Sequence, residues 1–243
     1  MVMIDERVRR ASRRRGAVGW WWIALSAVAI AVLAPLPYLT DSLRGLAEGH
    51  DQIAANYVPR PSWAQVAFYV HIGCGGLALL LSPAQFAARL RARAPRVHRV
   101  CGRVAMGCMV LAGSAGLVLA PMNLAGAVGT AGFGTLGALW IGFAVAAYRA
   151  IRRGDVASHR RWAVRAFALT YAAVMLRLWL VLLVPLHEVV AGLDEDAAFD
   201  RAYLIVPFLC WVPNLLVAEV MLRRRRSGRE THGAGGHGRP PVT

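Results

Sequence analysis

The stretch that decides the fold is "WAVRAFALTYAAVMLRLWLVLLVPL", residues 162–186, which holds 25 residues and only two charges, Arg165 and Arg177. A helix rises 1.5 Å per residue, so about 20 apolar residues are enough to cross the hydrocarbon core of a bilayer. The stretch therefore predicts a membrane-spanning helix. Over the whole chain of 243 residues, 57% are hydrophobic and only 17% are charged, which excludes an ordinary soluble domain.

Apolar runs of similar length recur, and we predict an all-α integral membrane bundle of about six transmembrane helices. It covers residues 18–222, between a basic tail at 1–17 and a basic, Gly- and Pro-rich tail at 223–243 that we expect to be disordered. A cleaved signal peptide is the alternative for the first run, but the run is long and Pro35 follows its best cleavage site, "AVLA". The predicted helices are 18–38, 63–87, 100–121, 127–149, 162–186 and 203–222.

The arginines predict the orientation of the bundle. All 28 basic residues are arginine, and six lie in each of the N-terminal tail, the link 88–103, the link 149–165 and the C-terminal tail, which makes 24. The intervening loops hold only Arg44, Arg60 and Arg201, together with eight acidic residues. By the positive-inside rule, both termini are expected to be cytoplasmic. Topology alone explains the net charge of +15, so we do not expect a nucleic-acid partner.

Small residues predict how two neighbouring helices pack. Stripes of this kind let helix backbones approach closely in lipid, where no hydrophobic force drives association. We therefore expect the helix 127–149 to pack on the helix 100–121, to which a short loop joins it. The stripe of the later helix comprises Gly126, Thr130, Gly134, Ala138, Gly142 and Ala146, and that of the earlier helix Cys108, Ala112, Gly116 and Ala120.

Ionisable residues near the basic ends of the helices form a first candidate site, the inner cluster of His98, Arg103, His159, Arg165 and Glu219. The helical rise places Arg103, Arg165 and Glu219 at one depth, with the two histidines just below. An acid at the edge of the hydrocarbon is costly unless paired, so Glu219 is expected to meet Arg103 or Arg165. Two alternatives are that the arginines reach headgroups instead, and that Glu219 pairs with Arg223 in its own helix.

A second candidate site is an intramembrane polar pocket formed by His71 and Arg177. Both lie about 22–24 Å from the basic ends of their helices, so their heights match. Arg177 is too deep to reach the near headgroups easily, which indicates a partner or a polar cavity. Gly73, Gly75 and Gly76 beside His71 leave room for a flat group. The plainer interpretation of His71 is a core histidine bonded to a backbone carbonyl.

Three functions are compatible with these residues. The first is the binding of a small or anionic ligand in the polar pocket, for transport, lipid handling or sensing. The second is a b-type haem or quinone-linked electron carrier, with His71, His98 and His159 as candidate haem ligands, because such haems take histidines from two helices at one depth. The third is a structural or accessory membrane subunit. The sequence contains no nucleophile triad, phosphate loop, zinc-protease motif or carboxylate pair, so an enzyme is not predicted.

Four motifs carry a resemblance to a known family. They are "HIGCGGLALLLSPAQF" (71–86), "HRVCGRVAM" (98–106), "GFGTLGALWIGFAVAAYRAIRRGD" (132–155) and "SHRRWAVRAFALTYAAVMLRL" (158–178). Over roughly residues 65–220 the chain resembles the predicted bacterial membrane proteins of the domain-of-unknown-function family 2306. The resemblance implies a multi-pass protein of the bacterial inner (plasma) membrane, surrounded by the lipid bilayer. It implies no activity.

Overall fold

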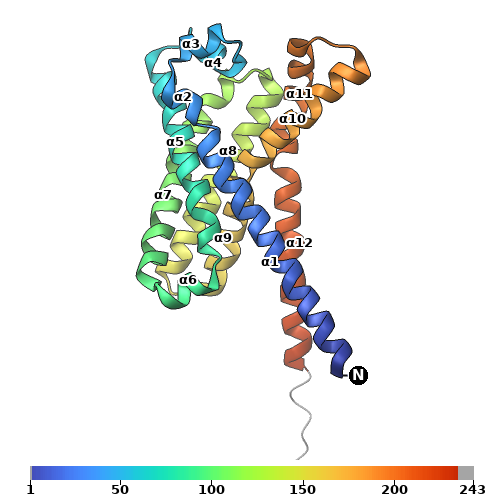
Figure 1. Ribbon diagram of the computed structural model, residues 1–243. Helices are drawn as coiled ribbons and strands as arrows, with labels where there is room; N and C mark the ends of the chain where they lie inside the picture. The colour runs from blue at the N-terminus through green and yellow to red at the C-terminus, as the bar shows by residue number, and fades with distance from the viewer. Residues whose placement is uncertain (1, 235–243) are drawn as a thin grey trace, which may run out of the picture.

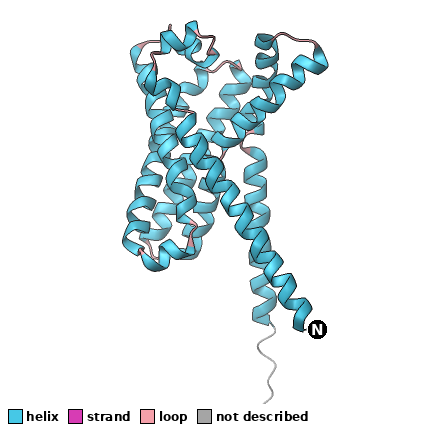
Figure 2. Ribbon diagram, in the orientation of Figure 1, coloured by secondary structure: helices cyan, strands magenta, loops and turns pink. Residues whose placement is uncertain are grey.

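The computed structural model describes residues 2–234, and describes side chains over residues 18–224. All regular structure in these residues is helical (Figure 2), as predicted. The helices are α1 (Val2–Leu33), α2 (Leu36–Thr40), α3 (Leu43–Glu48), α4 (Gln52–Tyr57), α5 (Ser62–Gln85), α6 (Ala88–Arg93), α7 (Pro95–Leu119), η1 (Ala120–Met122), α8 (Gly126–Arg152), α9 (Val156–Thr170), α10 (Ala172–Ala191), α11 (Glu195–Leu209) and α12 (Val212–Ala234).

The described residues contain six segments long and apolar enough to cross a membrane, which confirms the predicted fold class. The fifth and sixth begin earlier than predicted, at Val156 and Glu195, because each starts with a polar turn that an aspartate caps. The carboxylates of Asp155 and Asp194 accept hydrogen bonds from the N–H groups of Ser158 and Ala197. The segments are Val18–Thr40, Ser62–Gln85, Pro95–Met122, Gly126–Arg152, Val156–Ala191 and Glu195–Arg224.

Both predicted tails contain helix. Helix α1 already begins at Val2, and α12 continues to Ala234, although we expected disorder from residue 223. Arginine is a good helix former, and the chain after Arg224 holds no proline before Pro240, so nothing local stops the helix at the end of the apolar run. The last part of the predicted disordered tail, residues 235–243, lies outside the described residues.

Helices α5, α7, α8 and α9 pack in a ring, in which α5 contacts α7, α7 contacts α8, α8 contacts α9 and α9 contacts α5. Helix α1 crosses the outside of this ring against α5, and α12 packs against α9 (Figure 1). Helices α2, α3 and α4 and the turn between α10 and α11 lie at one end of the molecule. The start of α1, the end of α12 and α6 lie toward the other, here called the basic end.

Local chemistry explains why the fifth membrane segment is broken at Tyr171, between α9 and α10. The hydroxyl of Thr170 donates to the carbonyl of Ala166 at 2.8 Å, a bond that commonly bends a helix. The same hydroxyl accepts the indole N–H of Trp140 at 2.9 Å. Tyr171 is hydrogen-bonded to Ser26 of α1 at 2.7 Å, so the break joins three membrane segments.

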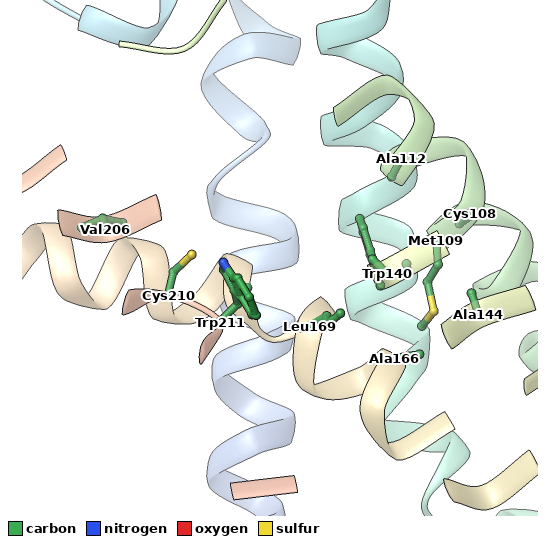
Figure 3. Close-up of a cluster of buried hydrophobic side chains, with 12 residues drawn as sticks. Cys108, Met109, Ala112, Trp140, Ala144, Ala166, Leu169, Val206, Cys210 and Trp211 are labelled. Atoms are coloured by element: carbon green, nitrogen blue, oxygen red, sulfur yellow. The ribbon is translucent and has the colours of Figure 1, made fainter. Parts of the chain in front are cut away.

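The main core extends from the ring to α10 and α11, and small side chains make up much of it. Ala112, Ala144 and Ala166 surround the larger Met109 and Trp140 (Figure 3). Large apolar side chains point outward instead, and those of Leu25 and Val181 are 63% and 71% exposed. This inversion is expected when lipid, rather than water, covers the surface.

The closest approach of α7 and α8 is at Gly113 and Gly137. A Cβ atom added to Gly137 would lie 3.3 Å from the carbonyl oxygen of Gly113, and one added to Gly113 would lie 3.4 Å from that of Gly137. Neither glycine belongs to the predicted stripes. The predicted packing of the helix 127–149 on the helix 100–121 is confirmed, since α8 contacts both α7 and η1. The α8 stripe contributes only in part: a Cβ atom on Gly134 would lie 3.9 Å from the Cβ of Ala120 in η1, whereas one on Gly142 would meet nothing within 4 Å.

Candidate functional site

The structure joins Arg165 of α9 to Glu219 of α12. The Nε and Nη2 atoms of Arg165 donate to the two carboxylate oxygens of Glu219 at 2.5 and 2.9 Å, a two-point ion pair. The two side chains are 20% and 29% exposed. The guanidinium also lies 4.8 Å from the ring centroid of Trp162, within cation–π range. Trp162 in turn packs against Phe143 of α8, at 5.5 Å between centroids.

Asp155 positions this part of α9 by capping its first turn. The cap fixes where the helix begins and therefore the rotation at which Arg165 emerges, almost three turns later. The hydrogen bonds that the Asp155 carboxylate accepts from Ser158 hold the pKa of Asp155 below its usual range. The cap is thus formed by the ionised carboxylate.

The other members of the inner cluster lie apart from the ion pair. Arg103 is exposed on α7 and is not the partner of Glu219. His159 Nδ1 lies 2.9 Å from the carbonyl oxygen of Ala147, and because a carbonyl only accepts, Nδ1 carries the proton and Nε2 is left as the acceptor. His98 lies within electrostatic range of His159, and its buried Nδ1 has no hydrogen-bond partner among the described residues.

Gln85, which our sequence analysis overlooked, lies beside His98. A Cβ atom on Gly102, one turn after His98, would lie 3.0 Å from the Gln85 Oε1 atom. The buried Gln85 Nε2 has no partner in the described part of the chain. A polar residue at the end of the apolar run "LLLSPAQF" was the signal that could have drawn attention to it.

At the other end of the ring, His71 is held against α7. Its Nδ1 donates to the carbonyl of Ala112 at 2.9 Å, and a Cβ atom on Gly116 would lie 3.1 Å from that nitrogen. Of the nearby glycines, Gly76 faces α1, where an added Cβ would lie 3.4 Å from the Ala31 carbonyl oxygen. The space predicted beside His71 is thus partly filled by α1 and α7.

Arg177 of α10 is partly buried and, among the described residues, has no carboxylate partner. Its Nη1 atom donates to the carbonyl of Ala173, one turn earlier, at 3.1 Å. His71 of α5, Tyr38 of α2 and Tyr203 of α11 all lie within electrostatic range of its guanidinium. The structure therefore brings the predicted pair His71 and Arg177 into one neighbourhood and adds two tyrosines that sequence reasoning missed.

The tyrosine side of this neighbourhood is supported by an aromatic cluster under α2–α4. The hydroxyl of Tyr38 donates to Asp51 at 3.0 Å, and the Tyr38 ring packs edge-on against Phe68 of α5, at 5.1 Å between centroids. Tyr57 covers the same Phe68 at 4.6 Å. Burial raises the pKa of Tyr57, so its hydroxyl stays neutral at physiological pH. The Arg177 site is defined as His71, Arg177, Tyr38 and Tyr203.

The surroundings of the histidines indicate which of them could bind a haem. His71 faces the α7 backbone, where its Nδ1 is bonded to the Ala112 carbonyl and its ring lies against Gly116. His187, near the same end, donates to the Leu183 carbonyl of its own helix. The described residues contain no group of three or more His, Cys, Asp or Glu side chains that could hold a metal ion. Of the three predicted haem ligands, His98 and His159 are therefore better candidates than His71.

Fold and site together define a multi-pass α-helical membrane protein with two arginines in its fifth segment. Arg165 is paired with an acid, and Arg177 has no acidic partner in the part of the chain that the structure describes. The family model described as "Predicted membrane protein (DUF2306)" matches residues 68–222, and the chain belongs to that family. The match covers the ring α5, α7, α8 and α9 and both arginines. Comparisons with curated proteins and with solved structures find no match.

Proposed function

We propose that the protein binds an anionic amphiphile in the membrane, with the anionic group at the Arg177 site and the apolar tail in the lipid. One observation carries the proposal, which is that Arg177 has no carboxylate among the described residues. A charge held in the hydrocarbon region without a counterion is costly. A carboxylate or phosphate can accept two hydrogen bonds from one guanidinium, and this would offset the cost.

The surroundings of Arg177 support this ligand class. The hydroxyl of Tyr203 and the ring of His71 supply polar groups around Arg177. Asp51, the acid bonded to Tyr38 of the same site, accepts the hydroxyl of Tyr38 and the N–H of Ala54 and forms no ion pair with Arg177. Tyr203 lies eight residues after Glu195, and His71 nine after Ser62, so both lie about 12–14 Å from the ends of α11 and α5. At this depth a ligand with an apolar tail is favoured over a water-soluble ion.

The excess of arginine at the basic end supports a cytoplasmic orientation for both termini, in the bacterial plasma membrane. In that orientation the Arg177 site is closer to the outer face. Binding of an amphiphile at this site is compatible with transport, lipid handling or sensing. All three functions begin with the binding step.

The test measures the thermal stability of detergent-purified protein with oleate and with oleyl alcohol, which has the same chain and no charge. A ligand at 100 times its Kd stabilises the folded state by about 2.7 kcal/mol. We expect oleate to raise Tm and oleyl alcohol not to. Arg177→Gln should abolish the oleate effect without lowering Tm in its absence, because the variant loses an uncompensated charge. Arg201→Gln, in the exposed turn of α11, is the charge-matched control. An unchanged oleate effect in Arg177→Gln would overturn the proposal.

The second candidate is a b-type haem between α7 and α9, and one observation favours it. His159 donates its Nδ1 proton to a backbone carbonyl, which is how metal-bound histidines are usually oriented, and this leaves Nε2 available. The test is the absorption spectrum of protein expressed with added haem. A Soret band that disappears in both His98→Ala and His159→Ala would establish this candidate, and colourless protein would exclude it.

A further inference from the structure

A groove runs along the outside of the bundle at the basic end, where the last turns of α8 meet the start of α9. Its volume is about 560 Å³, within the range of small-molecule sites. It is distinct from the Arg177 site, and the inference does not rest on the proposed function. The groove is lined by Ile141, Gly142, Val145, Ala146, Arg149, Ala150, Arg153, Asp155, Ser158 and Trp162.

The floor of the groove is the part of the α8 stripe at Gly142 and Ala146, and no described residue covers Gly142. Gly142 is exposed, and a Cβ atom added to it would meet nothing within 4 Å. One turn further, Ala146 continues the shallow surface toward the basic end. Such a floor of small residues is open to a linear hydrocarbon chain lying along the helix.

The wall of the groove is fixed before any ligand arrives. Trp162 packs against Phe143, at 5.5 Å between ring centroids, and against the guanidinium of Arg165, at 4.8 Å. Arg165 is itself held by its ion pair with Glu219. A preformed wall lowers the entropy that a ligand loses on binding.

The basic end of the groove carries a local excess of positive charge. Arg149 and Arg153 lie one turn apart on α8, both exposed, and neither has an ion-pair partner among the described residues. Asp155, which also lines the groove, accepts the N–H of Ser158 as the cap of α9 and lies close to the charge of Arg161. Two guanidinium groups above an apolar floor match a phosphate joined to an acyl chain.

We propose that this groove binds an anionic phospholipid, with its phosphate between Arg149 and Arg153 and one acyl chain along Gly142 and Ala146. The alternative occupant of a small-residue floor is the same helix of a second copy. A twofold dimer across this face would bring the two Arg149 and Arg153 pairs of the copies together, and like charges oppose that contact. The charges thus favour a lipid over a dimer.

The test compares the binding of phosphatidylglycerol and phosphatidylcholine to detergent-purified protein, by native mass spectrometry and by thermal shift. We expect phosphatidylglycerol to bind and stabilise, and phosphatidylcholine to do so much less. The double variant Arg149→Gln/Arg153→Gln should bind phosphatidylglycerol about 30-fold more weakly, the effect of two arginine–headgroup attractions. The matched control is Arg152→Gln/Arg160→Gln, which removes two exposed charges at the same end but outside the groove lining.

A second pair of variants tests the floor without changing charge. Gly142→Leu should fill the groove and weaken phosphatidylglycerol binding, whereas Ala138→Leu, on an exposed position one turn away and outside the lining, should not. Equal binding in all variants, or equal weakening in both double variants, would overturn the proposal. So would a dimeric wild type that Gly142→Leu converts to a monomer with lipid binding unchanged.

Discussion

The ion pair between Arg165 and Glu219 should be the polar contact that holds α12 on α9, and its removal should destabilise the protein. We predict that Glu219→Gln lowers the free energy of unfolding by about 2 kcal/mol. The two-point geometry, at 2.5 and 2.9 Å, would support a large loss, because hydrogen bonds to charged groups contribute about 1.5–3 kcal/mol each. The exposure of the pair, at 20% and 29%, limits that loss.

The magnitude lies between two measured limits. Exposed ion pairs contribute about 0.2–1 kcal/mol, whereas breaking a buried pair costs about 3–5 kcal/mol because one charge is left alone. A partly exposed pair near the membrane surface falls between them, at about 2 kcal/mol, which corresponds to about 4–8 °C in Tm for a chain of this size. Arg165→Gln should cost about 0.5–1 kcal/mol more than Glu219→Gln, since it also removes the cation–π contact with Trp162.

The assay is a double-mutant cycle measured as thermal stability in detergent. Arg165→Gln/Glu219→Gln should lose little more than Arg165→Gln alone, so that the coupling energy is about 1–2 kcal/mol. Glu219→Gln combined with Arg103→Gln should be additive, because Arg103 is exposed and apart. A third cycle, Glu219→Gln with Arg223→Gln, measures the coupling energy between Glu219 and the arginine one turn later in α12. Strict additivity in the Arg165 cycle would refute the reasoning.

Four further results are expected. Reporter fusions after residues 50, 124 and 195 should read outside and those after 95, 155 and 230 inside; an inside reading at 195 would contradict the topology. The lowered pKa of Asp155 means that its capping contribution is complete above about pH 4 and is lost as pH falls through its folded pKa; Tm of Asp155→Asn should therefore depend less on pH between 5 and 2 than that of wild type. Gln85→Leu should raise stability by about 1 kcal/mol, because it removes a buried amide nitrogen without a partner among the described residues, and a lower Tm would reveal a bound water or ligand atom. Gly137→Leu should lower Tm by forcing α7 and α8 apart, whereas Gly107→Leu, where a Cβ atom meets nothing within 4 Å, should not.

Heights along the helices could be predicted from the sequence, because a fixed rise per residue converts sequence position to depth. This reasoning placed Arg165 and Glu219 at one level, and His71 and Arg177 at another. It could not choose between Arg103 and Arg165 as the partner of Glu219. That choice depends on the rotation of each helix about its axis, and rotation is set by packing against neighbours. The sequence carries this information only through patterns on the whole helix surface.

The α8 stripe shows how such a pattern can mislead. Residues spaced by four advance about 400° on a helix of 3.6 residues per turn, so each successive member is rotated by about 40°. Six members therefore spread over about 200° and cannot all face one neighbour. Gly134 meets Ala120 of η1, and two turns later Gly142 has turned away to the outer surface. The contact with α7 is at Gly137, which lies on the same face of α8 as Trp140 and Ala144. Both of these residues are buried in the main core.

Arg165 and Arg177 occupy one membrane segment, yet their surroundings separate their roles. Arg165 lies near the basic end, has an acid and an aromatic ring, and contributes to the fold through both. Arg177 lies deeper, donates to the carbonyl of Ala173 in its own helix, and has no ion-pair partner among the described residues. A folding role would predict that Arg177→Gln destabilises the protein as Arg165→Gln does. A binding role predicts the opposite sign without ligand, because removing an uncompensated charge relieves a cost. The stabilities of these two variants, measured side by side, therefore distinguish an arginine that maintains the structure from one kept for a ligand.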